Sequence, residues 1–173
     1  MKRMGKPKLF LFIGAPGAGK TTIAQAVAEL TGAKHLWADA ERHKLFPRPT
    51  HSKEESTELY TKLNKTADYL LGEGRSVVFD TNFNFYIDRK KLRKIAAVNR
   101  ADTVLIWLTT PLALSKRRAV SPPTTRNGYD THMSDTQFDD IVCKLEVPRN
   151  NEKFIKIDGT KLDHERIKQI LQL

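Results

Sequence analysis

The chain has 173 residues, 39% of them hydrophobic, with one cysteine and a formal net charge of +10. This length suits one globular domain with a sizeable core, and no apolar stretch approaches the roughly 20 residues of a transmembrane helix. A single cysteine excludes an internal disulfide, so we expect a cytoplasmic protein, without membrane contact. We expect no signal peptide, because the apolar run after the basic N-terminus is only Leu9 to Ile13. The positive charge favours an anionic substrate, a nucleotide or a nucleic acid, but does not choose among them.

The first predicted strand, from Leu9 to Ile13, passes directly into Gly14-Ala15-Pro16-Gly17-Ala18-Gly19-Lys20-Thr21-Thr22. Apolar residues then return at helical spacing, which predicts a strand, a loop and a helix. In this context the spacing G-x-x-x-x-G-K-T indicates a phosphate-binding P-loop, because its glycines let backbone N–H groups turn around phosphate oxygens. We expect residues 14–22 to bind ATP, with Lys20 bridging the β- and γ-phosphates and the Thr21 hydroxyl binding Mg²⁺.

The first predicted helix runs from Lys20 to Leu30 and is followed by a short strand from Lys34 to Trp37. Asp39 and Arg42 come just after that strand. Ligands of parallel α/β sheets bind outside the carboxyl ends of the strands, so both side chains are placed to reach a second substrate. The alternative is that Asp39 caps a helix N-terminus and Arg42 is solvated.

A capping box at Ser52 and Glu55 predicts a helix that ends at Gly72. The next strand, Ser76 to Phe79, has no polar alternation, which is typical of a strand buried on both faces, and it leads into Asp80-Thr81-Asn82. A helix from Ile87 to Asn99 then carries five basic residues on one face, namely Arg89, Lys90, Lys91, Arg93 and Lys94. We favour a solvated face over a nucleic-acid contact here, because no aromatic residues alternate with the charges.

A strand from Thr103 to Thr109 precedes a short helix with Lys116, Arg117 and Arg118, of which we expect Lys116 and Arg118 to be solvated. The polar, turn-rich stretch that follows predicts a mobile lid over about residues 117–133. Arg117 stands at the start of this lid and Arg126 lies within it, and closure of the lid over ATP would bring guanidinium groups to the γ-phosphate while excluding water.

The last part of the chain predicts a helix capped by Ser134 and Gln137 that ends before Pro148, a strand from Lys153 to Ile157, and a closing helix from Leu162 to Leu173. Strands and helices thus alternate along the chain. This alternation predicts one α/β domain over residues 1–173, with a three-layer P-loop fold around a mostly parallel five-stranded sheet.

Several motifs together resemble the small P-loop kinases that include the 5′-hydroxyl polynucleotide kinases, with relatives among AAA-type and zeta-toxin-like kinases. They are residues 14–22, the pair Asp39 and Arg42, Asp80-Thr81-Asn82-Phe83-Asn84, and Lys116-Arg117 leading into the lid. The resemblance implies that Asp39 is the general base and that Arg42 contacts a phosphate of the acceptor.

The same resemblance places Asp80 near Mg²⁺ or in the acceptor pocket, with Asn82 beside it, and makes Arg117 a lid arginine. Arg126 stands where a second lid arginine is expected, although farther along the chain than in polynucleotide kinases. The turn at Asp158-Gly159-Thr160 resembles the adenine-side loop of such kinases. We thus expect Lys20, Asp39, Arg117 and Arg126 to be catalytic.

The expected function is an ATP-dependent kinase that transfers the γ-phosphoryl group to a hydroxyl, with a nucleic-acid 5′-end as the first acceptor. A small metabolite, nucleoside or antibiotic is the alternative acceptor. A nucleotide-binding switch or RNA-binding module without an acceptor is an alternative of another class. A nucleoside-monophosphate kinase is less favoured, because few arginines follow the second strand. The oligomeric state is open.

Overall fold

The computed structural model describes residues 5–120, 125–126, 129–130 and 133–172, with side chains described outside 121–132. Its centre is a sheet of five parallel strands in the order β2-β3-β1-β4-β7. They are β1 (Lys8–Ile13), β2 (Lys34–Trp37), β3 (Val77–Asp80), β4 (Asp102–Leu108) and β7 (Phe154–Ile157). The predicted parallel five-stranded sheet is therefore confirmed.

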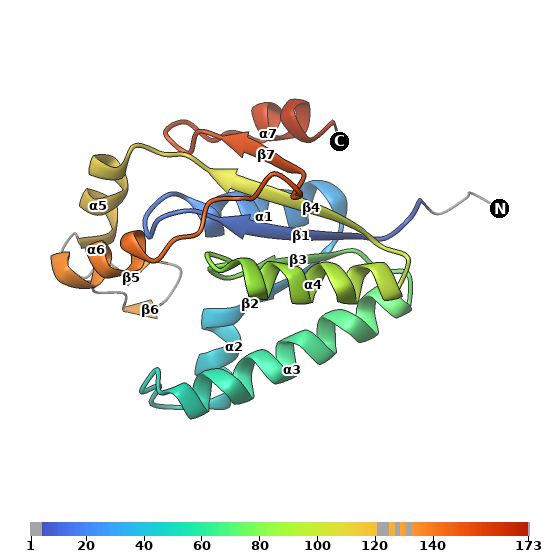
Figure 1. Ribbon diagram of the computed structural model, residues 1–173, viewed down its shortest axis with the longest axis horizontal. Coiled ribbons are helices and arrows are strands. Elements are labelled where there is room, and N and C mark those ends of the chain that lie inside the picture. The colour runs from blue at the N-terminus through green and yellow to red at the C-terminus, as the bar shows by residue number, and fades with distance from the viewer. Residues whose placement is uncertain (1–4, 121–124, 127–128, 131–132, 173) are drawn as a thin grey trace.

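Helices cover both faces of this sheet (Figure 1). On one face α3 (Lys53–Gly72) and α4 (Tyr86–Val98) pack against Leu9 and Leu11 of β1, while on the other α1 (Lys20–Thr31) and α7 (His164–Leu171) pack against Phe10 and Phe12. Alternate residues of β1 thus enter two separate cores, as the period of a strand requires. This arrangement confirms the three-layer α/β fold.

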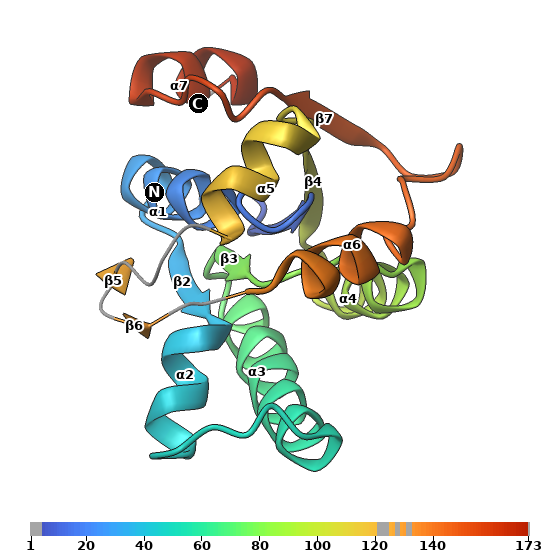
Figure 2. The same cartoon turned by 90° about the vertical axis from the view of Figure 1, so that its left-hand side faces the viewer.

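The carboxyl ends of the five strands meet at one edge of the sheet. Figure 2 looks onto this edge, where α2 (Ala38–Leu45), α5 (Leu112–Val120) and α6 (Asp135–Cys143) lie. Two short strands, β5 (Thr125–Arg126) and β6 (Tyr129–Asp130), pair antiparallel here. Within the described residues, no helix is both long and apolar enough to cross a membrane.

Both predicted N-terminal caps, Ser52 and Ser134, begin helices. The capping box of Ser134 and Gln137 begins α6, and α1 is followed by Gly32 as its C-cap, whose φ of 68° is left-handed. Ser52 caps α3 by accepting the Glu55 N–H, but the Glu55 carboxylate accepts from the Thr50 N–H and does not complete the box. Helix α6 ends at Cys143, before Pro148 as predicted, and α7 begins at His164, two residues after its predicted start, behind its cap Asp163.

The prediction that all five basic residues of α4 lie on a solvated face is wrong for Arg89. Lys90, Lys91 and Lys94 are exposed, but the Arg89 side chain is 0% exposed and Arg93 is only half-buried at 26%. Both pair with Glu152, whose segment covers this side of the helix. The burial of Arg89 has no local signal, because its partner is 63 residues away.

We predict that Gly159→Ala destabilises the protein. A Cβ at Gly159, just after β7, would overlap the Ala18 carbonyl oxygen and the Thr110 hydroxyl, both of which belong to buried residues. Overpacking of this kind costs about 1–3 kcal/mol of the free energy of unfolding, which urea denaturation measures. Gly5→Ala is the control, because nothing lies within 4 Å of that position. Equal stability of the two variants would contradict the packing described here.

Candidate active site

The glycine-rich loop joins the end of β1 to the start of α1. Gly17 and Gly19 have left-handed φ values of 76° and 103°, which only glycine adopts without strain. At Gly17 any side chain would also overlap the Ser115 carbonyl oxygen of α5. No side chain caps α1 at Gly19, so the N–H groups of its first turn face the loop without a side-chain acceptor. This geometry suits an anion such as a phosphate.

Lys20 lies across the mouth of this loop. Its Nζ donates to the carbonyl oxygens of Gly14 and Ala15, each at 2.8 Å. Burial lowers the pKa of Lys20 to about 8, and the nearby charges of Asp80 and Asp39 only partly oppose that effect. The ammonium group therefore rests on the loop's own carbonyls, close to two carboxylates and in a setting where its charge is poorly solvated.

Asp80 ends β3 and is 3% exposed. The Thr21 hydroxyl donates to its Oδ1 at 3.3 Å, and His35 Nε2 lies 3.0 Å from its Oδ2. The structure thus brings together the two residues predicted to bind Mg²⁺. A hydroxyl and a carboxylate are the oxygen ligands that Mg²⁺ takes beside substrate phosphates. Among the described residues, no group of three or more His, Cys, Asp or Glu side chains could hold a metal ion.

Asp39 lies in the first turn of α2, which follows β2 directly. The N-cap of α2 is Trp37, so Asp39 is not the cap of the alternative interpretation. Desolvation and the charge of Asp80 raise the pKa of Asp39, while His51 and Arg42 act in the opposite direction. The Asp39 side chain is exposed, and its charge, like that of Asp80, reaches Lys20.

Arg42 is 5% exposed and packs between α2 and α3. Its Nη1 lies 3.6 Å from the Glu55 carboxylate, and its Nη2 donates to the Ser56 hydroxyl at 3.3 Å. The guanidinium group is thus directed to α3, although its charge still reaches Asp39. Asn82 is exposed on the segment that follows β3.

The helices that flank the lid are tied to their surroundings. Lys116 pairs with Asp135 and Asp139 of α6, and Arg118 donates to the Gly159 carbonyl oxygen at 3.2 Å, so neither is simply solvated as predicted. Arg117 is exposed on α5. The Arg126 side chain lies outside the description, as do residues 121–124, 127–128 and 131–132 of the predicted lid.

Three residues near the site carried no predicted role. Asn84 accepts the Gly14 N–H at 3.3 Å, and His35 lies against Asp80. The Thr110 hydroxyl donates to the Ala18 carbonyl at 2.8 Å and accepts from the Gly159 N–H at 3.0 Å. Asn84 and Thr110 follow the carboxyl ends of β3 and β4, which is a signal that sequence could have used. His35, a lone histidine on a strand, offers no such signal.

Residues 9–148 match the family model described as an AAA domain. Curated relatives include uncharacterized proteins of Mycobacterium tuberculosis and Mycobacterium bovis, each 31% identical over 102 residues. These matches cover 52% of this chain, which spans only 20% of the length of each relative.

Solved structures share the fold across nearly the whole chain. A proposed kinase from Chloroflexus aurantiacus superposes with a TM-score of 0.76 at 20% identity, covering 96% of this chain and 97% of that one. The APS kinase CysC of Mycobacterium tuberculosis, in complex with AMPPNP and APS, gives 0.67 at 20% identity and 96% coverage of both chains. Kti12 of Chaetomium thermophilum, in complex with ADP-AlF3, gives 0.70 at 14% identity and 95% coverage of both.

We predict that Lys20→Met leaves the ligand-free protein at least as stable at pH 7 while abolishing its response to nucleotide. The lowered pKa means that the folded protein holds this proton less tightly than the unfolded chain, so ionised Lys20 destabilises the fold. Thermal denaturation with and without Mg·ADP measures both effects, since a ligand that binds only the folded state raises Tm. Lys62→Met, at an exposed position of α3, should keep the wild-type response. A full Mg·ADP shift in Lys20→Met would contradict the assignment of the loop.

Proposed function

The chain belongs to the AAA domain family. From that premise, and from the fold that it shares with solved kinases, we propose that it transfers the γ-phosphoryl group of ATP to a hydroxyl acceptor, with Asp39 as general base. One observation carries the proposal, namely the position of Asp39 in the first turn of α2, directly after β2, from where its charge, like that of Asp80 at the end of β3, acts on Lys20. The pKa of Asp39, although its side chain is exposed, is raised. A carboxylate with a raised pKa beside a phosphate cradle is suited to accept a proton.

In the proposed reaction, the loop N–H groups and the first turn of α1 hold the phosphates of ATP, and Lys20 leaves the carbonyls of Gly14 and Ala15 to contact them. When bound, Mg²⁺ supplies charge neutralisation to the phosphates, held by the Thr21 hydroxyl and the Asp80 carboxylate. The acceptor oxygen attacks the γ-phosphorus while Asp39 takes its proton. The bond from that phosphorus to the bridging oxygen breaks, and ADP leaves.

For the acceptor we propose a small hydroxyl compound. Arg42, the residue expected to contact an acceptor phosphate, is buried against α3 and lies beside the Glu55 carboxylate, which weakens the argument for a nucleic-acid end. The APS kinase that shares the fold was solved with a small molecule, APS, beside its nucleotide analogue. A 5′-hydroxyl polynucleotide is the second candidate, because the net charge is +10 and Lys90, Lys91 and Lys94 are exposed.

Incubation with γ-labelled ATP and a panel of sugars, polyols, nucleosides and 5′-hydroxyl oligonucleotides tests the proposal. We expect label on a small hydroxyl compound, and we expect Asp39→Asn to lose about 10²–10⁴-fold of the transfer rate while still binding Mg·ADP. Asp102→Asn is the matched control, because Asp102 is exposed at the start of β4, away from the carboxyl ends of the strands where the site lies. Label on oligonucleotides alone would select the second candidate. Slow hydrolysis that is insensitive to Asp39→Asn would instead indicate a nucleotide switch.

The pH dependence gives a separate prediction. Asp39 must be ionised to accept a proton, so kcat/KM for transfer should fall as pH falls through the pKa of this group. Since desolvation and Asp80 raise that pKa, the acid limb should have its midpoint above the ordinary aspartate value of about 4. A pH–rate profile that stays flat down to pH 4 would exclude Asp39 as the base.

A further inference from the structure

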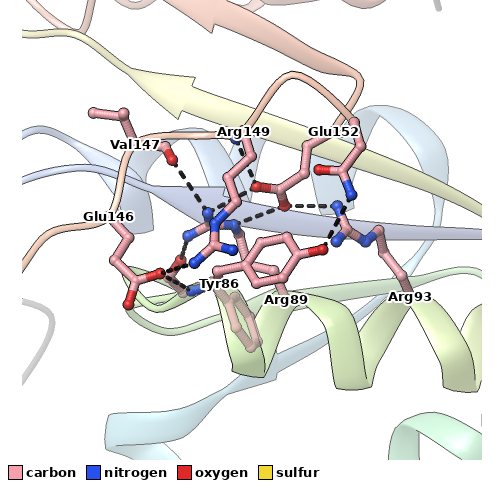
Figure 3. Close-up of polar contacts among 9 residues, drawn as sticks. Tyr86, Arg89, Arg93, Glu146, Val147, Arg149 and Glu152 are labelled. Carbon is pink, nitrogen blue, oxygen red and sulfur yellow. Dashed lines mark hydrogen bonds and ion pairs between the residues drawn. The ribbon is translucent and has the colours of Figure 1, made fainter.

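An ion pair without solvent contact lies between α4 and the segment that precedes β7. The side chains of Arg89 and Glu152 are both 0% exposed, and they form two parallel hydrogen bonds of 2.9 Å and 2.8 Å (Figure 3). Arg93 donates to the same carboxylate at 2.6 Å, and the Arg149 backbone N–H donates at 3.0 Å. Burial alone would raise the pKa of Glu152, but these hydrogen bonds and charges hold it below its usual range.

Buried pairs of this kind contribute little net stability, and breaking one is costly because a buried charge loses its partner. Arg89 Nη1 donates to the Phe83 carbonyl oxygen at 2.9 Å, and the Glu146 N–H donates to the Asn84 carbonyl oxygen at 2.8 Å. Arg89 and Glu146 thus fix the backbone of Phe83 and Asn84, which lies between β3 and α4.

Further contacts attach the covering segment 146–152 to the start of α4. The Glu146 carboxylate accepts the Tyr86 N–H at 3.0 Å, and the Arg149 guanidinium lies 3.8 Å from the centre of the Tyr86 ring, as Figure 3 shows. On the opposite side, the Phe83 N–H donates to the Phe12 carbonyl oxygen of β1 at 3.1 Å. Residues 83–84 are therefore fixed from both sides.

The side chain of Asn84 connects residues 83–84 to the glycine-rich loop. Asn84 is 4% exposed, and its Oδ1 accepts the N–H of Gly14, the first residue of the loop. The carbonyl oxygen of Gly14 in turn accepts from Lys20 Nζ. The Gly14 residue is thus held by Asn84 through its N–H and holds Lys20 through its carbonyl oxygen.

We propose that Asn84 is a positioning residue for Lys20, and that the buried Arg89–Glu152 pair sets the position of Asn84. The inference rests on the proposed function only in requiring that the loop bind nucleotide phosphates. Loss of the Asn84 amide leaves the Gly14 N–H without its acceptor and frees the loop entrance to turn. The Lys20 ammonium group is then no longer held in the same position before phosphates bind. Loss of the Glu152 charge reaches the same lysine indirectly, through Phe83 and Asn84.

The test measures the Kd for Mg·ADP by calorimetry, well below Tm, in the wild type, Asn84→Ala, Glu152→Gln and the double variant. We expect each single substitution to weaken binding by about tenfold, the scale of one hydrogen bond to a charged or strictly oriented group. Both substitutions are expected to act on Lys20 through the same contacts, so their effects should not add. The Kd of the double variant should exceed that of the more weakly binding single variant by no more than about twofold. A residue that only stabilises the fold would lower Tm and leave Kd unchanged.

Asn151→Ala is the matched control. It removes the exposed hydrogen bond from Asn151 to the Tyr86 hydroxyl in the same cluster but leaves Arg89, Glu152 and Asn84 untouched, so its Kd should equal that of the wild type. Where Glu152→Gln does not fold, Arg93→Gln replaces it, because that side chain is partly exposed and Arg89 still neutralises Glu152. The same non-additivity is then expected on a smaller scale.

An unchanged Kd in Asn84→Ala, or strictly multiplicative effects in the double variant, would overturn the inference while leaving the proposed function intact. A wild-type protein that binds no Mg·ADP would overturn the proposed function, and the inference with it. The two failures are therefore distinguishable by the wild-type measurement alone.

Discussion

The structure depends on the backbone N–H groups of the first turn of α1, which follows the glycine-rich loop after β1 and has no side-chain cap. Left-handed glycines turn these groups inward, and α1 begins without a side-chain cap. A parallel sheet places the ends of its other strands at the same edge, which brings Asp80 from β3, Thr110 after β4 and Gly159 after β7 to one loop. Phosphate is the ligand that this convergence suits.

Charge around the loop is arranged for a ligand that carries its own charge. Burial lowers the pKa of Lys20 to about 8, and desolvation together with Asp80 raises the pKa of Asp39. Both directions disfavour the ionised forms that the proposed phosphoryl transfer requires. A bound polyphosphate would pair with the Lys20 ammonium group. The buried charge that lowers the stability of the ligand-free protein would therefore favour binding of the ligand. Arg42, by contrast, already lies beside a carboxylate, that of Glu55 on α3. This ion pair supports a structural role for Arg42, as a contact between α2 and α3.

Sequence reasoning succeeded where the signal is local. The strand–loop–helix context of residues 14–22 and the strand from Lys34 to Trp37 were predictable from glycine spacing and apolar runs, and the parallel order followed from alternating elements. It failed where a partner is distant, because no helical period reveals a glutamate 63 residues away, so Arg89 was assigned to a solvated face. The same limit applies to Arg42 and Asn84, whose surroundings form only when the chain is folded.

The most direct test of the central claim is a crystal structure with Mg²⁺ and a non-hydrolysable ATP analogue. We predict that Lys20 Nζ will leave the carbonyl oxygens of Gly14 and Ala15 for the β- and γ-phosphates, that Thr21 and Asp80 will face the metal, and that Asp39 will lie on the γ-phosphate side. A nucleotide bound elsewhere, with Lys20 still on those carbonyls, would contradict the account.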